Sequence, residues 1–211
     1  GMPVYDARKR IGAELSRESG VPADVIVPVP APGVPAAMGY AADSGIPFDL
    51  GIIRNHYVGR TFIQPTQAGR DAKVKVKFNP VREVLAGKSV VMVDDSIVRG
   101  TTTRGLVALV RGAGAREVHM RVSSPPIIGP CYYGIDTPNR EELIAANNSI
   151  DEIAKLIGVD SLGYLSLDGM LQAVPGGPDG FCHACFSGEY PTPAPSVPVK
   201  LRYGRREVVG V

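Results

Sequence analysis

The feature that most constrains the fold is an apolar run that ends in two acids and a glycine–threonine cluster. Residues 88–93 read Lys-Ser-Val-Val-Met-Val, the strongest strand signal in the chain, and Asp94 and Asp95 follow at once. Residues 96–103 then read Ser-Ile-Val-Arg-Gly-Thr-Thr-Thr, and the apolar positions after them predict a helix to about Gly112. A further strand is predicted at 117–123. Strand, helix and strand in this order predict a right-handed parallel crossover.

Further segments extend this unit. Amphipathic or small-residue patterns predict helices at 6–19 and 33–44, short apolar runs predict strands at 24–30 and 48–53, and more helix is expected within 139–157. The region 24–123 is therefore expected to form an α/β structure with a mainly parallel sheet flanked by helices. We expect residues 1–174 to form one domain and residues 175–211, with their Pro- and Gly-rich stretches, to form a small irregular subdomain and tail that carries cysteines.

Length and charge exclude several classes of protein. A chain of 211 residues with 44% apolar residues can bury a core without disulfides or metals. Its formal net charge of +2 argues against a strongly electrostatic nucleic-acid binder. No apolar run approaches the roughly 20 residues that span a bilayer, and no signal peptide is recognisable. We therefore expect a cytoplasmic protein that binds neither nucleic acid nor membrane.

The acid pair and the residues after it predict a binding site for a phosphorylated sugar. Ligands of open α/β sheets bind outside the carboxyl ends of the strands, where Asp94 and Asp95 would lie. Adjacent carboxylates need a divalent cation or hydroxyl donors as partners. Gly100 and the threonines at 101–103 offer backbone N–H groups and hydroxyls at a helix start, which favours an anion. The alternative is an acid pair that serves only as a turn and helix cap.

A basic segment precedes this unit. Residues 54–80 carry one acid, Asp71, against six cations, namely Arg54, Arg60, Arg70, Lys73, Lys75 and Lys77. No helical or strand period is sustained through the segment. Long loops inside compact domains are often active-site lids, so we interpret it as a basic lid. A solvated surface run is the alternative.

The motifs together resemble a known family. Residues 89–103 are similar to the phosphoribosyl pyrophosphate (PRPP) signature of type I phosphoribosyltransferases. Residues 57–65, 124–126, 133–136 and 142–145 further resemble the amidophosphoribosyltransferases, also called glutamine PRPP amidotransferases, and the resemblance covers about residues 4–192. It implies the type I phosphoribosyltransferase fold. It also implies a pentosyltransferase of purine biosynthesis, in which ammonia attacks C1 of PRPP, pyrophosphate leaves and 5-phosphoribosylamine forms.

The resemblance also implies roles for individual residues. Asp94 and Asp95 would bind the ribose hydroxyls and Mg²⁺. The 5′-phosphate would be held by the segment that follows them, namely Ser96, Ile97, Val98, Arg99, Gly100, Thr101 and Thr102. Lys77 would reach the pyrophosphate, with Arg60 and Gln64 in the matching loop as further catalytic contacts. The family forms oligomers and is inhibited by purine nucleotides, so both are expected here.

The chain departs from the family in two places. Ala31-Pro32 stands where the family usually has Asp-Ser, whose Ser contacts magnesium. Cys131, Cys182 and Cys185 match three of the four ligands of a four-iron, four-sulfur cluster in one branch of the family, so an iron–sulfur cluster is a candidate cofactor with one ligand missing. Zinc held by these thiols with His183 or water, and three free thiols, are the alternatives.

The family normally has an N-terminal glutaminase half; no segment of this chain resembles it, and the chain begins Gly1-Met2. Either this is the C-terminal half alone, or the natural protein lacks the glutaminase. Three functions follow from these observations. The chain is a phosphoribosyltransferase that uses free ammonia, a non-catalytic paralogue that binds PRPP or purine nucleotides, or another PRPP transferase such as a salvage enzyme. The last does not account for the cysteines or for the segment Phe-Ile-Gln-Pro at 62–65.

Overall fold

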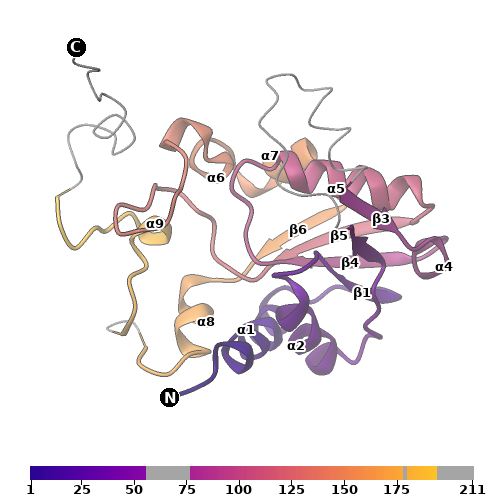
Figure 1. Cartoon of the computed structure of the whole chain (residues 1–211), viewed down its shortest axis with the longest axis horizontal. Helices are drawn as coiled ribbons and strands as arrows, with labels where there is room; N and C mark the ends of the chain where they lie inside the picture. The colour runs from indigo at the N-terminus through magenta and orange to yellow at the C-terminus, as the bar shows by residue number, and fades with distance from the viewer. Residues whose placement is uncertain (56–76, 178–179, 194–211) are drawn as a thin grey trace, which may run out of the picture.

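A central parallel sheet organises the molecule (Figure 1). The computed structural model describes residues 1–55, 77–177 and 180–193. The sheet has the strand order β1–β4–β5–β6, and all three pairings are parallel; its strands are β1 (Val25–Pro28), β4 (Ser89–Asp94), β5 (Glu117–Val122) and β6 (Ser161–Tyr164). The carboxyl ends of the strands therefore meet at one edge.

Helices cover both faces of the sheet (Figure 1). Helices α1 (Val4–Ser19), α2 (Val34–Ser44) and α8 (Leu167–Gln172) lie on one side, and α5 (Thr101–Gly112) and α7 (Ile150–Ile157) lie on the other. Alternate residues of β4 supply the two apolar cores. Val91 and Val93 pack in the cluster that holds Leu15 of α1, while Val90 and Met92 belong to the cluster on the other face. This two-sided burial explains why β4 is continuously apolar in sequence.

Helices α1 and α2 approach each other through two glycines. A Cβ atom on Gly12 of α1 would overlap the backbone of Ala36, and one on Gly39 of α2 would overlap the backbone of Lys9. The backbones of the two helices therefore pack directly against each other. Tyr40 of α2 is fully buried and belongs to the same apolar cluster as Leu15 of α1.

The predicted strand at 48–53 is only partly correct. Phe48 forms a single parallel bridge with Ile26, and β2 (Ile52–Arg54) pairs antiparallel with β3 (Phe78–Pro80) in a separate two-stranded sheet. A short helix, α4 (Arg82–Leu85), then leads into β4. The ends of the basic segment are thus strands rather than loop, because Arg54 and Phe78 pair with each other across this ladder. Residues 56–76 lie outside the described part of the chain.

The sheet extends beyond the predicted region. After β5 the chain forms a one-turn 3-10 helix, η1 (Arg140–Glu142), then α6 (Ile144–Asn147), α7, β6 and α8. Neither β6 nor α8 was predicted. The strand β6, Ser-Leu-Gly-Tyr, is short and contains a glycine, which weakens a strand pattern. The segment expected to be irregular includes one short helix, α9 (Ala184–Ser187). The domain boundary at residue 174 stays a prediction. In the described ranges, no helix is long and apolar enough to cross a membrane.

Candidate active site

Asp94 ends β4 at the carboxyl edge of the sheet. It is only 8% exposed, and its Oδ1 accepts a hydrogen bond of 2.9 Å from the backbone N–H of Asp95. Burial, and then the charge of the neighbouring Asp95, raise the pKa of Asp94 well above its ordinary value. A cation or a set of hydroxyl donors beside it would stabilise its ionised form. Asp95 itself is exposed, so the pair presents one buried and one accessible carboxylate.

Ser123 fixes the backbone of Asp94 from the next strand. Its N–H and its Oγ both donate to the carbonyl oxygen of Asp94, at 2.9 and 3.1 Å. Ser123 follows β5 directly, so the parallel register of β4 and β5 brings the two residues together. The sequence analysis did not assign Ser123 to the site. The sequence feature that could have indicated Ser123 is a hydroxyl side chain at the carboxyl end of the neighbouring parallel strand.

The loop after Asp95 leads into α5 through a left-handed glycine. Gly100 has φ +73°, a conformation that favours glycine, and its carbonyl accepts from the N–H of Arg104. The N–H groups of the first helical turn have no partner within the helix, and Thr101 and Thr102 lie in that turn. Ile97, by contrast, is 1% exposed and packs in the core, so only its backbone could contact a ligand.

The loop after β1 reaches the same edge. The N–H of Val29 donates to the carbonyl of Val93 at 2.8 Å, and the N–H of Gly33 donates back to Val29. The peptide bond between Pro30 and Ala31 is cis. Ala31 and Pro32 are both exposed. The Ala31-Pro32 departure therefore stands next to the end of β4, because β1 and β4 are neighbours in the sheet.

Of the three predicted contacts for a leaving group, only Lys77 is described. Its carbonyl accepts from the N–H of Asn55 at 2.8 Å, and its Nζ lies 5.8 Å from the centre of the Phe78 ring. Within the described ranges, no hydrogen bond or ion pair joins it to Asp94 or to the loop that follows. Arg60 and Gln64 lie outside the described residues.

The structure brings the segments of the cysteines together without forming a metal site. The carbonyl of Cys185 accepts from the N–H groups of Ile128 and Gly129, and burial followed by the charge of Cys131 raises the pKa of Cys185. Cys182 is exposed. In the part of the chain that the structure describes, no group of three or more Cys, His, Asp or Glu side chains is arranged to hold a metal ion.

The expected iron–sulfur cluster is therefore not supported. Such a cluster takes four thiolates, and this chain has three cysteines in all. The magnesium expectation differs, because Mg²⁺ is usually bound by one or two carboxylates together with substrate phosphates. The adjacent Asp94 and Asp95 carboxylates, one buried and one exposed, fit that requirement.

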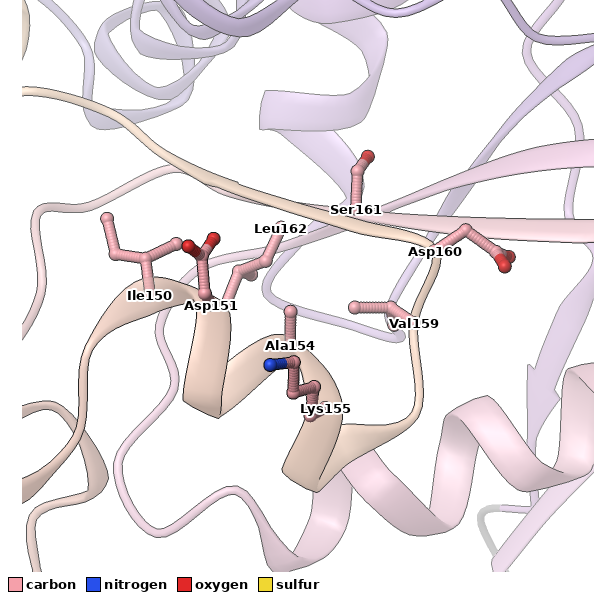
Figure 2. A pocket seen from close by; sticks show the side chains of 8 residues that line it. All are labelled: Ile150, Asp151, Ala154, Lys155, Val159, Asp160, Ser161 and Leu162. Atoms are coloured by element: carbon pink, nitrogen blue, oxygen red, sulfur yellow. The ribbon is translucent and has the colours of Figure 1, made fainter.

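A separate cavity lies away from this edge. It has a volume of about 370 Å³ and opens between α7 and the start of β6, where Ile150, Lys155 and Leu162 lie along its wall (Figure 2). Ser161, the first residue of β6, lines it, whereas Asp94 is the last residue of β4. The cavity is therefore not part of the candidate active site.

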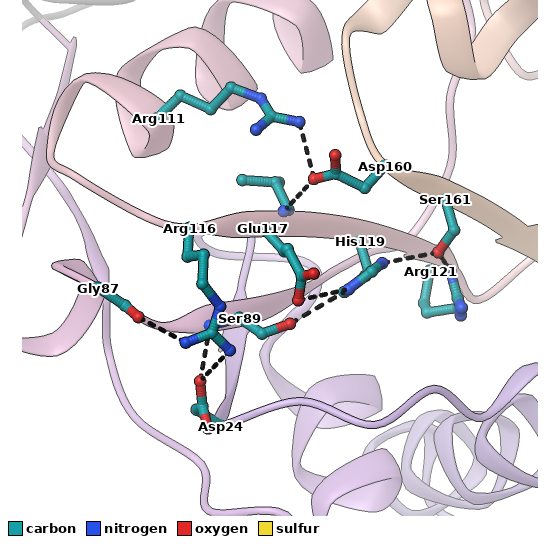
Figure 3. Close-up of polar contacts among 11 residues, drawn as sticks. Asp24, Gly87, Ser89, Arg111, Arg116, Glu117, His119, Arg121, Asp160 and Ser161 are labelled. Carbon is teal, nitrogen blue, oxygen red and sulfur yellow. Dashed lines mark hydrogen bonds and ion pairs between the residues drawn. The ribbon is translucent and has the colours of Figure 1, made fainter.

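Two aspartates hold neighbouring strands together at their amino ends (Figure 3). Asp24 Oδ2 accepts from the N–H of Ser89 at 2.7 Å and from Arg116 at 3.2 Å. Asp160 Oδ2 accepts from the N–H of Val118 at 2.7 Å and from Arg111 at 2.8 Å. The hydrogen bonds are reciprocal: the N–H of Asp24 donates to the carbonyl of Ser89, and the N–H of Asp160 donates to the carbonyl of Val118. These contacts hold the strand register on the side opposite the site.

Buried polar side chains lie next to these two aspartates. His119 contacts the hydroxyls of Ser161 and Ser89, at 2.9 and 3.2 Å. Arg121, which is 5% exposed, donates to the carbonyl oxygen of Ser19, the last residue of α1. A cation at the carboxyl end of a helix is favourable, so Arg121 ties α1 to the sheet.

Comparisons with known proteins show the family of this chain. The phosphoribosyl transferase domain family matches residues 1–124, which include β1, β4, β5 and the Asp94 loop. The chain therefore belongs to this family. Its curated relatives include amidophosphoribosyltransferases that cover more than nine-tenths of it. The protein from Archaeoglobus fulgidus is 54% identical over 92% of this chain, and the chloroplastic one from Arabidopsis thaliana is 55% identical over 95%.

Solved structures show the same architecture. An allosteric regulatory enzyme of purine biosynthesis is 54% identical, with a TM-score of 0.83 over 92% of this chain. The glutamine PRPP amidotransferase of B. subtilis, complexed with ADP and GMP, is 53% identical with the same TM-score. The expected type I phosphoribosyltransferase fold is thereby confirmed. This chain spans 42–43% of those two solved chains, and 43% and 35% of the two curated relatives named above.

Proposed function

We propose that this chain is the phosphoribosyltransferase part of an amidophosphoribosyltransferase and that it converts PRPP and ammonia to 5-phosphoribosylamine and pyrophosphate. The observation that carries the proposal is the carboxyl edge of the sheet. There the buried Asp94, the exposed Asp95 and the glycine-opened start of α5 follow one another in a chain that is 54% identical to named amidophosphoribosyltransferases. Carboxylates for a sugar diol and N–H donors for a phosphate stand side by side.

The acid pair would hold the ribose of PRPP. Two carboxylates can accept hydrogen bonds from the 2- and 3-hydroxyls of the sugar, which fixes the ring and its C1. Asp94 and Asp95 would also hold Mg²⁺, which when bound neutralises charge on the pyrophosphate group. Ser123 keeps the backbone of Asp94 in place during the reaction. The 5′-phosphate would lie on the loop 96–102, against the N-terminal turn of α5.

Ammonia then attacks C1 as the C1–oxygen bond breaks. The new carbon–nitrogen bond forms, pyrophosphate leaves with the electron pair, and the nitrogen loses a proton to solvent. Cations stabilise the charge on the leaving group, so we assign that role to Lys77 and Arg60, and the neutral amide of Gln64 would donate a hydrogen bond to the same group. The basic segment that carries them would also exclude water, which attacks the same carbon.

The partners are proposed in the same way. Purine nucleotides are the proposed regulators, since the similar B. subtilis structure holds ADP and GMP. A homo-oligomer and a cytoplasmic location complete the proposal. The alternative, a non-catalytic paralogue that binds PRPP or nucleotides, has Ala31-Pro32 in its favour, because neither side chain can bind a metal.

One experiment separates these readings. The chain is incubated with PRPP, Mg²⁺ and ammonium at alkaline pH, where free ammonia is abundant, and pyrophosphate release is followed. We expect release that depends on ammonium. Glutamine in place of ammonium should give none, because no segment of this chain resembles the glutaminase half of the family. PRPP binding without pyrophosphate release would favour the non-catalytic paralogue. Absence of PRPP binding would contradict the proposed activity, and absence of both PRPP and purine nucleotide binding would contradict both readings.

A further inference from the structure

We propose that residues 140–148, which comprise η1 and α6, are a brace that positions the loop 98–100, with Glu142 and Asn147 as its positioning residues. The inference rests on the proposed function, because that loop is where the substrate phosphate would bind. The brace lies outside the sequence motif around Asp94, about 40 residues later in the chain.

Three contacts join the brace to three successive loop residues. Arg99 Nε donates to Glu142 Oε2 at 2.8 Å. The N–H of Ile144 donates to the carbonyl of Val98 at 2.9 Å. A Cβ atom on Gly100 would lie 2.7 Å from Cδ1 of Ile144, so the side chain of Ile144 covers the glycine. An ion pair, a hydrogen bond and a packing contact therefore act on adjacent positions.

The hydrogen bond at Val98 determines which way the next N–H points. In a planar trans peptide the C=O and the following N–H point in opposite directions. Because the carbonyl of Val98 points at Ile144, the N–H of Arg99 points away from the brace. A carbonyl turned toward a phosphate would repel it, whereas an N–H attracts it. Holding this one peptide plane thus favours an anion at the loop.

The brace is itself held in shape by Asn147. Its Nδ2 donates to three carbonyl oxygens, those of Arg140, Glu141 and Leu143, at 3.1, 3.2 and 2.9 Å. Leu143 is fully buried and anchors the segment in the protein. The side chain of Asn147 therefore closes η1 and α6 into one compact turn, from which Glu142 and Ile144 contact the loop.

The exposure of the ion pair suggests an effect on position rather than on folding. The side chains of Arg99 and Glu142 are each 49% exposed. Exposed ion pairs contribute little to stability. Loss of this pair should therefore leave the protein folded, while the loop gains freedom to turn its N–H groups away from the phosphate.

The test compares Glu142→Gln and Asn147→Asp with Glu141→Gln. Asn147→Asp keeps the size of the side chain but replaces its donors by a carboxylate that faces three carbonyls. Glu141 is the matched control, since its carboxylate is exposed and makes no hydrogen bond or ion pair among the described residues. We expect KM for PRPP to rise about three- to fivefold for Glu142→Gln and roughly tenfold for Asn147→Asp, with kcat within twofold. Glu141→Gln should match the wild type.

Hydrogen exchange on the protein without substrate provides a second measurement. The amide of Ile144 and the amides of residues 97–101 should exchange faster in both brace variants. The melting temperature of Glu142→Gln should stay close to that of the wild type. Unchanged KM and unchanged exchange in both variants would overturn the proposal, as would equal effects in Glu141→Gln. If the wild type itself releases no pyrophosphate, the proposed function fails while the exchange measurement still tests the brace.

Discussion

Gly33 packs against the carbonyl oxygen of Val93 so closely that a Cβ atom on residue 33 would overlap that oxygen. The same oxygen accepts the N–H of Val29 at 2.8 Å. The loop between Val29 and Gly33 is therefore held against Val93, the residue that precedes Asp94. Whatever side chains stand at positions 31 and 32 lie at the edge where the acid pair ends β4.

This geometry gives the first prediction. Replacing Ala31→Asp together with Pro32→Ser should strengthen Mg²⁺-dependent PRPP binding roughly tenfold, because one recovered contact to a charged group contributes about 1.5–3 kcal/mol. Releasing the φ of proline costs a few tenths of a kcal/mol through the unfolded state, which the contact outweighs. PRPP titrations at several magnesium concentrations measure the effect. Coincident curves for the two proteins would show that this loop does not contact the metal.

The second prediction concerns the acid pair. Asp94→Asn with Asp95→Asn should weaken PRPP binding by roughly a hundredfold or more, since two contacts to charged groups are lost. The hydrogen bond from the Asp95 N–H should survive, because an asparagine oxygen accepts it equally well. Calorimetric titration with PRPP measures the loss. An unchanged affinity would remove the acid pair from the site.

The same variant should change stability with a defined pH dependence. The pKa of Asp94 is raised in the folded protein by burial and then by Asp95, so the folded state keeps a proton that the unfolded state releases near pH 4. Wild-type stability therefore decreases as pH rises from about 4 through the raised pKa. The variant should melt at a higher temperature than the wild type at pH 7–8, and the difference should vanish near pH 4. Circular dichroism melts across this range test the sign.

His119 should act in the opposite direction. Burial and then the charge of Arg121 lower its pKa, although Glu117 and Asp160 act to raise it. Below the ordinary histidine pKa of about 6.5, His119 binds a proton in the unfolded chain but stays neutral in the folded protein. The free energy of unfolding therefore decreases as pH falls from there. His119→Gln should flatten this loss between pH 7 and 5.5. A variant that loses stability as steeply as the wild type over that interval would exclude His119 as the cause.

The last prediction tests the packing of α1 on α2. Gly39→Ala should destabilise the protein by about 3 kcal/mol, because the new methyl group meets the backbone of Lys9, which cannot move aside. Gly112→Ala is the matched control, since nothing lies within 4 Å of its Cβ position at the end of α5. It should be neutral or stabilising by up to about 1 kcal/mol. Urea unfolding midpoints compare the two, and equal midpoints would contradict the close helix contact.

Local patterns predicted the centre of this protein. The run of apolar residues before Asp94, the glycine at 100 and the helical period after it are short-range features, and β4 and α5 lie where they indicate. The motifs there also carried the family resemblance, which the relatives at 54–55% identity bear out. The strand β6 was missed because four residues with a central glycine carry too little periodicity to be recognised.

Tertiary structure alone decided how distant segments meet. The sequence by itself determined that an acid pair and an anion-binding helix start follow one strand, since these residues are consecutive. It could not show that Ser123 holds the backbone of Asp94, or that Glu142 and Ile144 contact the loop at 98–100. Those contacts depend on the parallel register of β4 with β5 and on where the chain returns after β5. Such pairings join residues far apart in the chain, and no local propensity specifies them.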